Sequence, residues 1–250
     1  MSSFDEHLQD WRSYTAEPWN RVRYAVVRDV LAAHLGDVGT GAPRLDVLDV
    51  GGADGLDAAP LQRLGHRVTV LDPAEGMLAL ARERGLRTEV GGLDDLGGRP
   101  AVDAVLCHYV LQYRPDPAAD LRRLVRVLRP DGLLTVVLPN PDHRVLTTFL
   151  RQGPDAALAE LAATRAPTLT FGTEVAKIAL PRLERWVADA GMEVVDVFGG
   201  RTVGDLMLDN GPKEDPEFYA SWERLEIALS RREPFRRMGQ FYGVVARRAC

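Results

Sequence analysis

The chain has 250 residues, of which 46% are hydrophobic and 27% charged, and its formal net charge is −5. This composition is typical of a globular protein of one or two domains, and the negative balance argues against a protein coated in nucleic acid while leaving room for a local basic face. No apolar run reaches the roughly 18 residues of a membrane span, the start is acidic and unlike a secretory signal, and Cys107 and Cys250 give neither a disulfide framework nor a metal spacing. We therefore expect a cytoplasmic protein with no membrane partner and no metal.

The first part of the chain alternates between helical and strand patterns. Residues 21–35 have the apolar spacing of an amphipathic helix, and 45–50 (LDVLDV) form a short apolar run typical of a buried strand. A glycine-rich turn follows that strand. Residues 58–65 return to helical spacing, and 66–72 are predicted to be the next strand, which ends in Asp72.

The same alternation continues to about residue 140. Residues 73–85 are predicted to be a helix and 87–92 a short strand, and 102–113 begin as a strand and change to loop or helix. A strong helix is expected over 116–132, followed by a strand over 133–140. Strands that alternate with helices at this spacing indicate a parallel, doubly wound sheet.

The remainder of the chain behaves differently. Residues 141–180 are rich in Pro, Thr and Ala and have poor periodicity, which suits a lid or a substrate-binding segment. Residues 181–200 are predicted to be a helix and then a strand, 215–233 a long helix, and 238–248 a last strand. There is no internal repeat or low-complexity linker, so we expect a single domain over 1–250.

The turn after the first strand, within VLDVGGADGL, has the composition of a ligand-binding loop. Gly51, Gly52 and Gly55 allow the backbone to approach a ligand closely, and ligands of such sheets bind at the carboxyl ends of the strands. The second strand ends in Asp72, 20 residues after Gly52, which suits a carboxylate that binds a ribose diol. Turn and acid together predict a cofactor of the adenosine type.

The acids of the turn indicate which adenosine cofactor it is. The sequence lacks the G-x-G-x-x-G pattern of dinucleotide sites, and Asp49, Asp54 and Asp57 would repel a pyrophosphate. They would tolerate the ammonium and sulfonium groups of S-adenosylmethionine (SAM). Ala53 stands where a third evenly spaced glycine is expected. The alanine is tolerable if residue 53 has a negative φ and its Cβ points away from the ligand, and on that expectation we predict a working, slightly reshaped site.

Several segments resemble the class I SAM-dependent methyltransferases. They are LDVLDVGGADG, VTVLDPAEGMLALAR, DAVLCHYVLQYRPDP and DLRRLVRVLRPDGLLTVVLPN, and they cover roughly residues 20–140. MEVVDVFG and FYGVVARR look like the last two strands of that family. The resemblance implies a Rossmann-like fold with a mostly parallel, seven-stranded sheet and an antiparallel last strand. Residues 20–140 would be the cofactor-binding half, and 141–180 and 201–237 would be cap segments for the acceptor.

Within that class, the chain is most similar to the tRNA 5-carboxymethoxyuridine carboxyl methyltransferase group. The similarity lies in VRYAVVRDVL and in YASWERLEIALSRREPFRRMGQFYGVVARR. It implies that Arg23 binds the SAM carboxylate and that His108 lines the cofactor pocket. Gly92 and Leu93 fall beside the adenine.

Two residues depart from the pattern of that group. Ala53 replaces a glycine of the turn, and Gly243 stands where the group has a histidine. Residues 141–180 also match poorly, although this segment would select the acceptor. These departures put the acceptor in doubt more than the cofactor.

The predicted cofactor-binding residues come from five segments of the chain. They are Arg23, Asp49, Gly51, Gly52, Ala53, Gly55, Asp72, Pro73, Met77, Gly92, Leu93, Asp94 and His108. Three of these residues also have a simpler interpretation. Arg23 would then be a surface arginine of its helix, Met77 an ordinary core residue, and Asp94 a solvated acid beside the site. His108 has three readings, which are cofactor contact, a general base for the acceptor, and packing.

Three residues are candidates for acceptor binding. Tyr113 would contribute to an aromatic pocket, although core packing explains it as well. His143 would face the acceptor or else lie in a surface loop. Arg201, with other arginines of the carboxyl-terminal part, would form a wall that binds a carboxylate or RNA phosphates, unless these arginines are merely solvated.

The sequence thus predicts a SAM-dependent methyltransferase that acts on a polar or carboxylated small molecule. A carboxylate acceptor is already ionised and needs no base. The alternative acceptor is a modified wobble uridine of tRNA, which the acidic balance disfavours. An alternative from another class is a non-catalytic SAM-binding protein.

Overall fold

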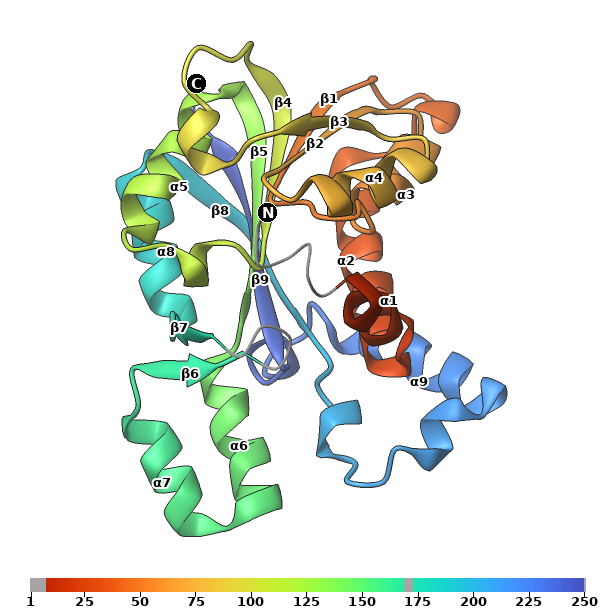
Figure 1. Ribbon diagram of the computed structural model, residues 1–250, viewed down its shortest axis with the longest axis vertical. Helices are drawn as coiled ribbons and strands as arrows, with labels where there is room; N and C mark the ends of the chain where they lie inside the picture. Colours follow the sequence, from red (N-terminus) through yellow and green to blue (C-terminus); the bar gives the residue numbers. More distant parts are fainter. Residues whose placement is uncertain (1–7, 169–172, 250) are drawn as a thin grey trace.

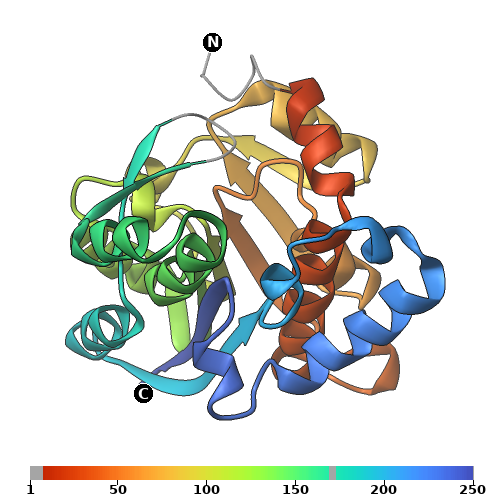
Figure 2. The same cartoon turned by 90° about the horizontal axis from the view of Figure 1, so that it is seen from below.

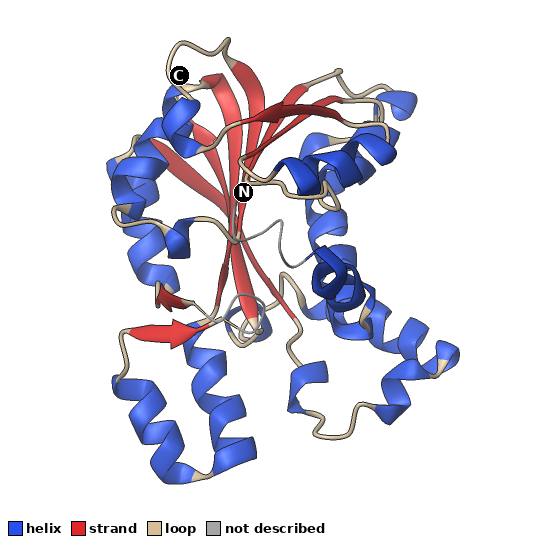
Figure 3. Ribbon diagram, viewed as in Figure 1, coloured by secondary structure: helices blue, strands red, loops and turns tan. Residues whose placement is uncertain are grey.

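A computed structural model describes residues 8–168 and 173–249. Its main sheet has seven strands in the order β3-β2-β1-β4-β5-β9-β8, and a separate two-stranded sheet pairs β6 with β7 (Figures 1 and 3). The strands are β1 Asp46–Val50, β2 Arg67–Asp72, β3 Arg87–Val90, β4 Val102–His108, β5 Leu128–Pro139, β6 Arg165–Pro167, β7 Glu174–Ala176, β8 Met192–Gly200 and β9 Phe241–Arg248.

The α-helices connect these strands and extend beyond them. They are α1 Leu8–Ala16, α2 Pro18–Leu35, α3 Ala58–Arg63, α4 Glu75–Glu83, α5 Pro117–Arg126, α6 Pro141–Gln152, α7 Pro154–Ala162, α8 Leu180–Asp189 and α9 Pro216–Leu229. In Figure 1, α5 and α8 lie on one side of the sheet, and α2, α3 and α4 lie on the other. Helices α6 and α7 project beyond the end of β5, at the lower left of that view.

The strand pairing confirms the expected topology. β1 pairs in parallel with both β2 and β4, so the chain runs outward to β3 and then resumes on the other side of β1. β9 lies between β5 and β8 and is antiparallel to both. The sheet is therefore doubly wound with an antiparallel last strand, and its order reverses between β1 and β4, where ligands of such sheets bind.

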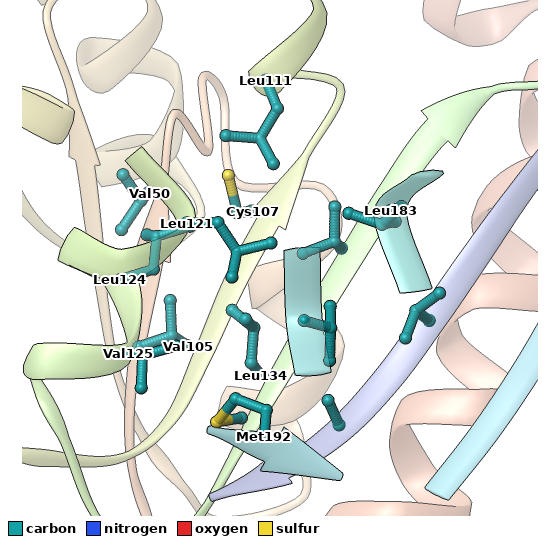
Figure 4. Close-up of a cluster of buried hydrophobic side chains, with 14 of the residues drawn as sticks. Val50, Val105, Cys107, Leu111, Leu121, Leu124, Val125, Leu134, Leu183 and Met192 are labelled. Carbon is teal, nitrogen blue, oxygen red and sulfur yellow. The ribbon is translucent and has the colours of Figure 1, made fainter. Parts of the chain in front are cut away.

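Each face of the sheet has its own hydrophobic core. On one face, α5 and α8 pack onto the strands through Leu121, Leu124 and Leu183, together with the buried thiol side chain of Cys107 (Figure 4). On the other face, α2 packs through a cluster that includes Val26. Burial on both faces explains why residues 104–107 of β4 and 133–138 of β5 are nearly continuous apolar runs instead of alternating ones.

The structure differs from the sequence predictions in two places, the segment between α5 and β5 and the amino-terminal helix α1. The helix expected over 116–132 ends at Arg126, and β5 already begins at Leu128, opposite Val102. A register shift follows, with Asp131 at a φ of +62°, so the RPDG segment is an irregular part of the strand instead of a helix end. Helix α1 has no counterpart among the predicted elements.

The segment 141–180 has more regular structure than its composition suggested. It forms α6 and α7 and the two strands of the β6–β7 hairpin. Pro141 and Pro154 stand in the first turns of the two helices, where proline needs no N–H partner, and the Asn140 side chain caps α6 by accepting from the N–H of Asp142. The prolines therefore begin helices instead of interrupting them.

Within 8–168 and 173–249, no helix combines the length and apolar character needed to cross a membrane. In the same part of the chain, no group of three or more His, Cys, Asp or Glu side chains could hold a metal ion. Cys250 lies outside the described residues.

Candidate functional site

A cavity of about 490 Å³ lies at the carboxyl ends of β1, β2 and β4. Figure 2 looks at the molecule from this end, with α6, α7, β6 and β7 on one side and α1 and α2 on the other. Both sides contribute to the wall, through Tyr14 and Arg23 on one side and Arg144 and Lys177 on the other. The volume is in the range of small-molecule sites, roughly 300–1,000 Å³.

The glycine turn after β1 forms one wall of this cavity. Gly51 has a φ of +73°, and a Cβ there would lie 2.4 Å from a Val110 methyl carbon. A Cβ on Gly52 would lie 2.4 Å from Asp49 Oδ2. The turn therefore requires glycine at both positions, because the backbone packs directly on the ends of β1 and β4.

Ala53 has a φ of +47°, so the expectation of a negative φ was wrong. The N–H of Ala53 donates to Asp72 Oδ2 at 2.9 Å, and this bond holds the residue in the left-handed region. The left-handed conformation costs an L-residue with a Cβ roughly 1–2 kcal/mol. The alanine is thus a strained member of a turn that favours glycine.

The substitution Ala53→Gly is expected to raise the free energy of unfolding by roughly 0.5–1 kcal/mol, because relief of the strain exceeds the extra entropy of the unfolded glycine chain. Urea unfolding followed by circular dichroism measures the change. As a control, Ala188→Gly on the exposed side of α8 should lower stability by up to about 1 kcal/mol. A midpoint for Ala53→Gly at or below that of the wild type would show that the turn is not strained.

Asp72 connects the turn to the second strand. Its Oδ2 accepts from the N–H of Ala53, and its Oδ1 accepts from the N–H of Ala74 at 2.8 Å. The residue is 7% exposed and lines the cavity. One carboxylate therefore fixes the turn and the entry to α4 and also presents negative charge at the cavity wall.

Asp49 lies beneath the turn and has a buried carboxylate oxygen with no hydrogen bond. The residue is 2% exposed, and Oδ2 has no partner within the described residues. Burial raises the pKa of Asp49 well above its ordinary value, and the neighbouring carboxylates of Asp57 and Asp72 raise it further. The ionised form of Asp49 is therefore disfavoured in the protein alone, and a cationic or N–H-bearing ligand in the cavity would stabilise it.

A chain of polar contacts runs from α2 to β5 along the floor of the cavity. Arg23 Nη1 lies 2.9 Å and 3.0 Å from the two carboxylate oxygens of Asp57. Asp57 Oδ2 is 2.9 Å from His108 Nδ1, and His108 Nε2 is 2.8 Å from the hydroxyl of Thr135. Both ring nitrogens of His108 are therefore engaged, which leaves the imidazole no free nitrogen for an acceptor.

This network determines the charge state of Asp57. Burial alone would raise the pKa of Asp57, but the charge of Arg23 and the hydrogen bond with His108 hold it below its ordinary value. The guanidinium of Arg23 also stacks on Tyr24, 3.9 Å from the ring centroid. Arg23 is thus a fixed cation of the cavity wall and not a solvated helix arginine.

Most of the predicted cofactor residues lie around this one cavity. Those that line it are Arg23, Asp49, Gly51, Gly52, Ala53, Asp72, Pro73, Met77, Gly92, Leu93 and His108. Gly55, with a φ of +74°, instead packs toward Leu86. Asp94 is also not in the wall, because its exposed carboxylate binds Arg114 and Arg123.

Of the three candidates for acceptor binding, two line the cavity and one does not. Tyr113 and Arg201 line the cavity, and Arg201 pairs with Asp205 through two hydrogen bonds of 3.0 Å and 2.7 Å. His143 is 2% exposed, so it does not lie in a surface loop, and it is not in the cavity wall. Its Nδ1 bonds to the Met238 carbonyl at 2.7 Å, and burial lowers its pKa.

Other residues of the wall were not singled out from the sequence. Trp11 and Tyr14 come from α1, and Arg144 and Lys177 come from the segment after β5. The sequence indicated Asp57 only as one of the negative charges of the glycine turn. Its contact with His108 joins residues 51 positions apart in the chain, and no local pattern indicates such a pair.

Comparison with known proteins agrees with this geometry. The sequence model of the family described as "Methyltransferase domain" matches residues 48–136. The tRNA 5-carboxymethoxyuridine methyltransferase of Escherichia coli (strain K12) is 25% identical over 240 residues, which cover 91% of this chain and 88% of that protein. The ubiquinone biosynthesis O-methyltransferase of Xanthomonas oryzae pv. oryzae (strain PXO99A) is 34% identical over 164 residues, covering 61% of this chain and 64% of that protein.

Among solved structures, a similar fold occurs in the 1,6-didemethyltoxoflavin-N1-methyltransferase of Burkholderia thailandensis, whose structure contains S-adenosylhomocysteine (SAH). The TM-score is 0.58 at 20% identity, and the match covers 98% of this chain and 84% of that chain. This similarity concerns the fold.

The residues of the cavity fit SAM. The unpartnered Asp49 oxygen suits an ammonium group, Arg23 suits a carboxylate, and Asp72 ends β2 where a ribose is bound in sheets of this kind. The glycine turn leaves room for close backbone approach. Fold, cavity and the match of residues 48–136 to the methyltransferase family model agree, and together with the similarity to named methyltransferases they support a class I SAM-dependent methyltransferase.

Proposed function

We propose that the enzyme transfers the methyl group of SAM to a polar or carboxylated small-molecule acceptor. The main support is the cap that α6, α7, β6 and β7 form over the cavity. The cap contributes Arg144, Thr168 and Lys177 to the same wall as the cofactor residues, so donor and acceptor would share one enclosed space. We assign residues 141–180 and 201–237 to acceptor binding and 20–140 to cofactor binding.

Each end of SAM has candidate ligands in this arrangement. Arg23 would bind the carboxylate, Asp49 and the turn residues Gly51, Gly52 and Ala53 the amino-acid end, and Asp72 the ribose. The residues proposed to surround the adenine are Pro73, Met77, Gly92 and Leu93. Gly55, which packs toward Leu86, would support the turn from outside the wall, whereas Asp94, which pairs with Arg114, is assigned no contact with SAM.

When bound, SAM supplies a methyl carbon that its sulfonium already activates. The chain's own residues then have to align the acceptor with that carbon and exclude water. The contacts of His108 with Asp57 and Thr135 favour a role in positioning Asp57 and Arg23 over a role as general base. This supports an acceptor that is already nucleophilic, such as a carboxylate.

A second candidate acceptor is a modified uridine of tRNA. The similarity to the E. coli tRNA methyltransferase, which extends over 91% of this chain, favours it. The surface of the cap argues against a tRNA acceptor. Helices α6 and α7 together contain two arginines and three acidic residues, and they expose apolar side chains, namely Leu146, Phe149, Leu150, Leu158 and Leu161. Binding of an RNA backbone requires a basic footprint instead.

The two acceptor classes can be separated by assay. The purified protein is incubated with SAM and either the small-molecule fraction or the tRNA fraction of a cell extract, and SAH is measured. We expect SAH only with the small-molecule fraction. SAH formation with tRNA, together with an affinity for tRNA that falls steeply with salt, would contradict the proposal and support the second candidate.

A further inference from the structure

The cap side of the cavity contains two cations that share a single carboxylate. Arg144 lies on α6, Glu160 on α7, and Lys177 directly after β7. Lys177 Nζ contacts both the side chain and the backbone carbonyl of Glu160, and Arg144 Nε lies 2.9 Å from Glu160 Oε1. Arg144 and Lys177 both line the cavity.

Glu160 is ionised and can neutralise only one of these cations. Burial alone would raise the pKa of Glu160, but Lys177 and Arg144 outweigh it, so the pKa lies below its ordinary value. Arg144 and Lys177 thus both form ion pairs with the same carboxylate. The charges of Arg144, Glu160 and Lys177 therefore sum to one surplus positive charge.

The other cations of the cavity wall are neutralised within the protein. Arg201 forms a two-bond pair with Asp205. Arg23 is paired with Asp57, and Arg114 binds Asp120 at 2.7 Å. The surplus charge is therefore a local property of the site formed by Arg144, Glu160 and Lys177, which we term the cap cation site.

The acids of the cavity lie at its other end. Asp49 and Asp57 belong to β1 and the turn, and Asp72 ends β2, which are the elements that would hold the cationic end of SAM. Besides the SAM carboxylate, which Arg23 would bind, these acids disfavour a second ligand anion at that end, and the cap attracts it. The cavity wall also contains several planar side chains, which are Trp11, Tyr14, Tyr24, Tyr109 and Tyr113.

We propose that the acceptor is a small planar molecule with a monoanionic group, a carboxylate, which binds at the cap cation site between Arg144 and Lys177. One surplus charge matches a monoanion, and the fork of an arginine suits the two oxygens of a carboxylate. The anion is a recognition group, whichever atom receives the methyl group. This inference rests on the proposed small-molecule acceptor and specifies its chemical class.

Equilibrium binding to the SAH-saturated protein tests the site without any turnover. Calorimetric titrations compare benzoate, its uncharged analogue benzamide, and inorganic phosphate. We expect benzoate to bind about tenfold more tightly than benzamide and more tightly than phosphate. Equal binding of benzoate and benzamide, or preferential binding of phosphate, would overturn the carboxylate assignment.

Two variants that change the local charge in opposite directions distinguish an anion-binding site from a cluster with only a structural role. Arg144→Gln should weaken benzoate binding about tenfold, whereas Glu160→Gln, which leaves both cations unneutralised, should strengthen it severalfold. Arg151→Gln is the matched control, because Arg151 is an exposed arginine of the same helix and does not line the cavity. Benzamide binding should be the same in all three. Weaker benzoate binding in Glu160→Gln with unchanged SAH affinity would count against the site.

This result is independent of the acceptor assay. If small-molecule fractions are methylated but benzoate binds no better than benzamide, the inference alone fails. If only tRNA is methylated while Arg144→Gln loses benzoate binding, the proposed acceptor class fails and the anion site remains.

Discussion

Replacing Asp72 with alanine is expected to raise the dissociation constant for SAM by at least about 100-fold. Hydrogen bonds to a charged group contribute roughly 1.5–3 kcal/mol each, and a ribose diol offers two donors. The substitution also removes the acceptor for the N–H groups of Ala53 and Ala74, so the turn itself loses its anchor. Calorimetric titration with SAM and with SAH measures the effect.

Asp94→Ala is the matched control for Asp72→Ala. Asp94 is also an acid placed shortly after a strand, but its side chain is 62% exposed and is bound to arginines. We expect its removal to leave SAM affinity within about twofold, consistent with the small energies of exposed ion pairs. Circular dichroism shows whether each variant is folded. A folded Asp72→Ala variant with unchanged SAM affinity would remove Asp72 from the cofactor site.

The substitution Asp57→Asn is expected to lower the free energy of unfolding by about 3 kcal/mol, because it leaves the buried charge of Arg23 without its counter-charge. SAM affinity should fall as well, since Asp57 holds both Arg23 and His108 in place. Urea unfolding at neutral pH gives the first quantity and calorimetry the second. Asp29→Asn, which breaks the half-exposed pair of Asp29 with Arg231, should cost less than about 1 kcal/mol.

The contribution of Asp57 depends on pH in a defined direction. Its pKa in the folded protein is below the ordinary carboxyl value, so the ionised form stabilises the fold above the unfolded pKa, about 3.9. That stability is lost as the pH falls through the folded pKa. The difference between wild type and Asp57→Asn should therefore be full at pH 7 and shrink below about pH 4. A difference that grows on acidification would contradict the assigned network.

The sheet and the cofactor half follow from local sequence patterns. Buried parallel strands are short apolar runs, and 45–50 and 66–72 agree with β1 and β2 to within one residue at each end. The backbone approach at Gly51 and Gly52, and the acid at the end of β2, are likewise readable because each depends on neighbours in the sequence. These are the parts of the site that a strand and its following turn fix on their own.

The acceptor-binding part of the site could not be predicted from local sequence patterns in the same way. Helices α6 and α7 stand away from the sheet, and the leucines of α7, such as Leu158, are exposed, so α7 lacks the clear apolar stripe by which helices are recognised. The cap of α6 at Asn140 with Pro141 in the first turn was a usable signal. The positive φ of Ala53 was not, since it depends on a hydrogen bond to Asp72 across two strands.

The position of β9 affects how this protein is made. In the described part of the sheet, β5 and β8 are joined only through β9, which pairs with seven residues of β5 and eight of β8 but leaves the ribosome after both of them. Until residues 241–248 emerge, both older strands present unpaired edges, the kind of surface that aggregates. Closure of the sheet is therefore a late event in synthesis, and a product released before Phe241 has no route to the native sheet.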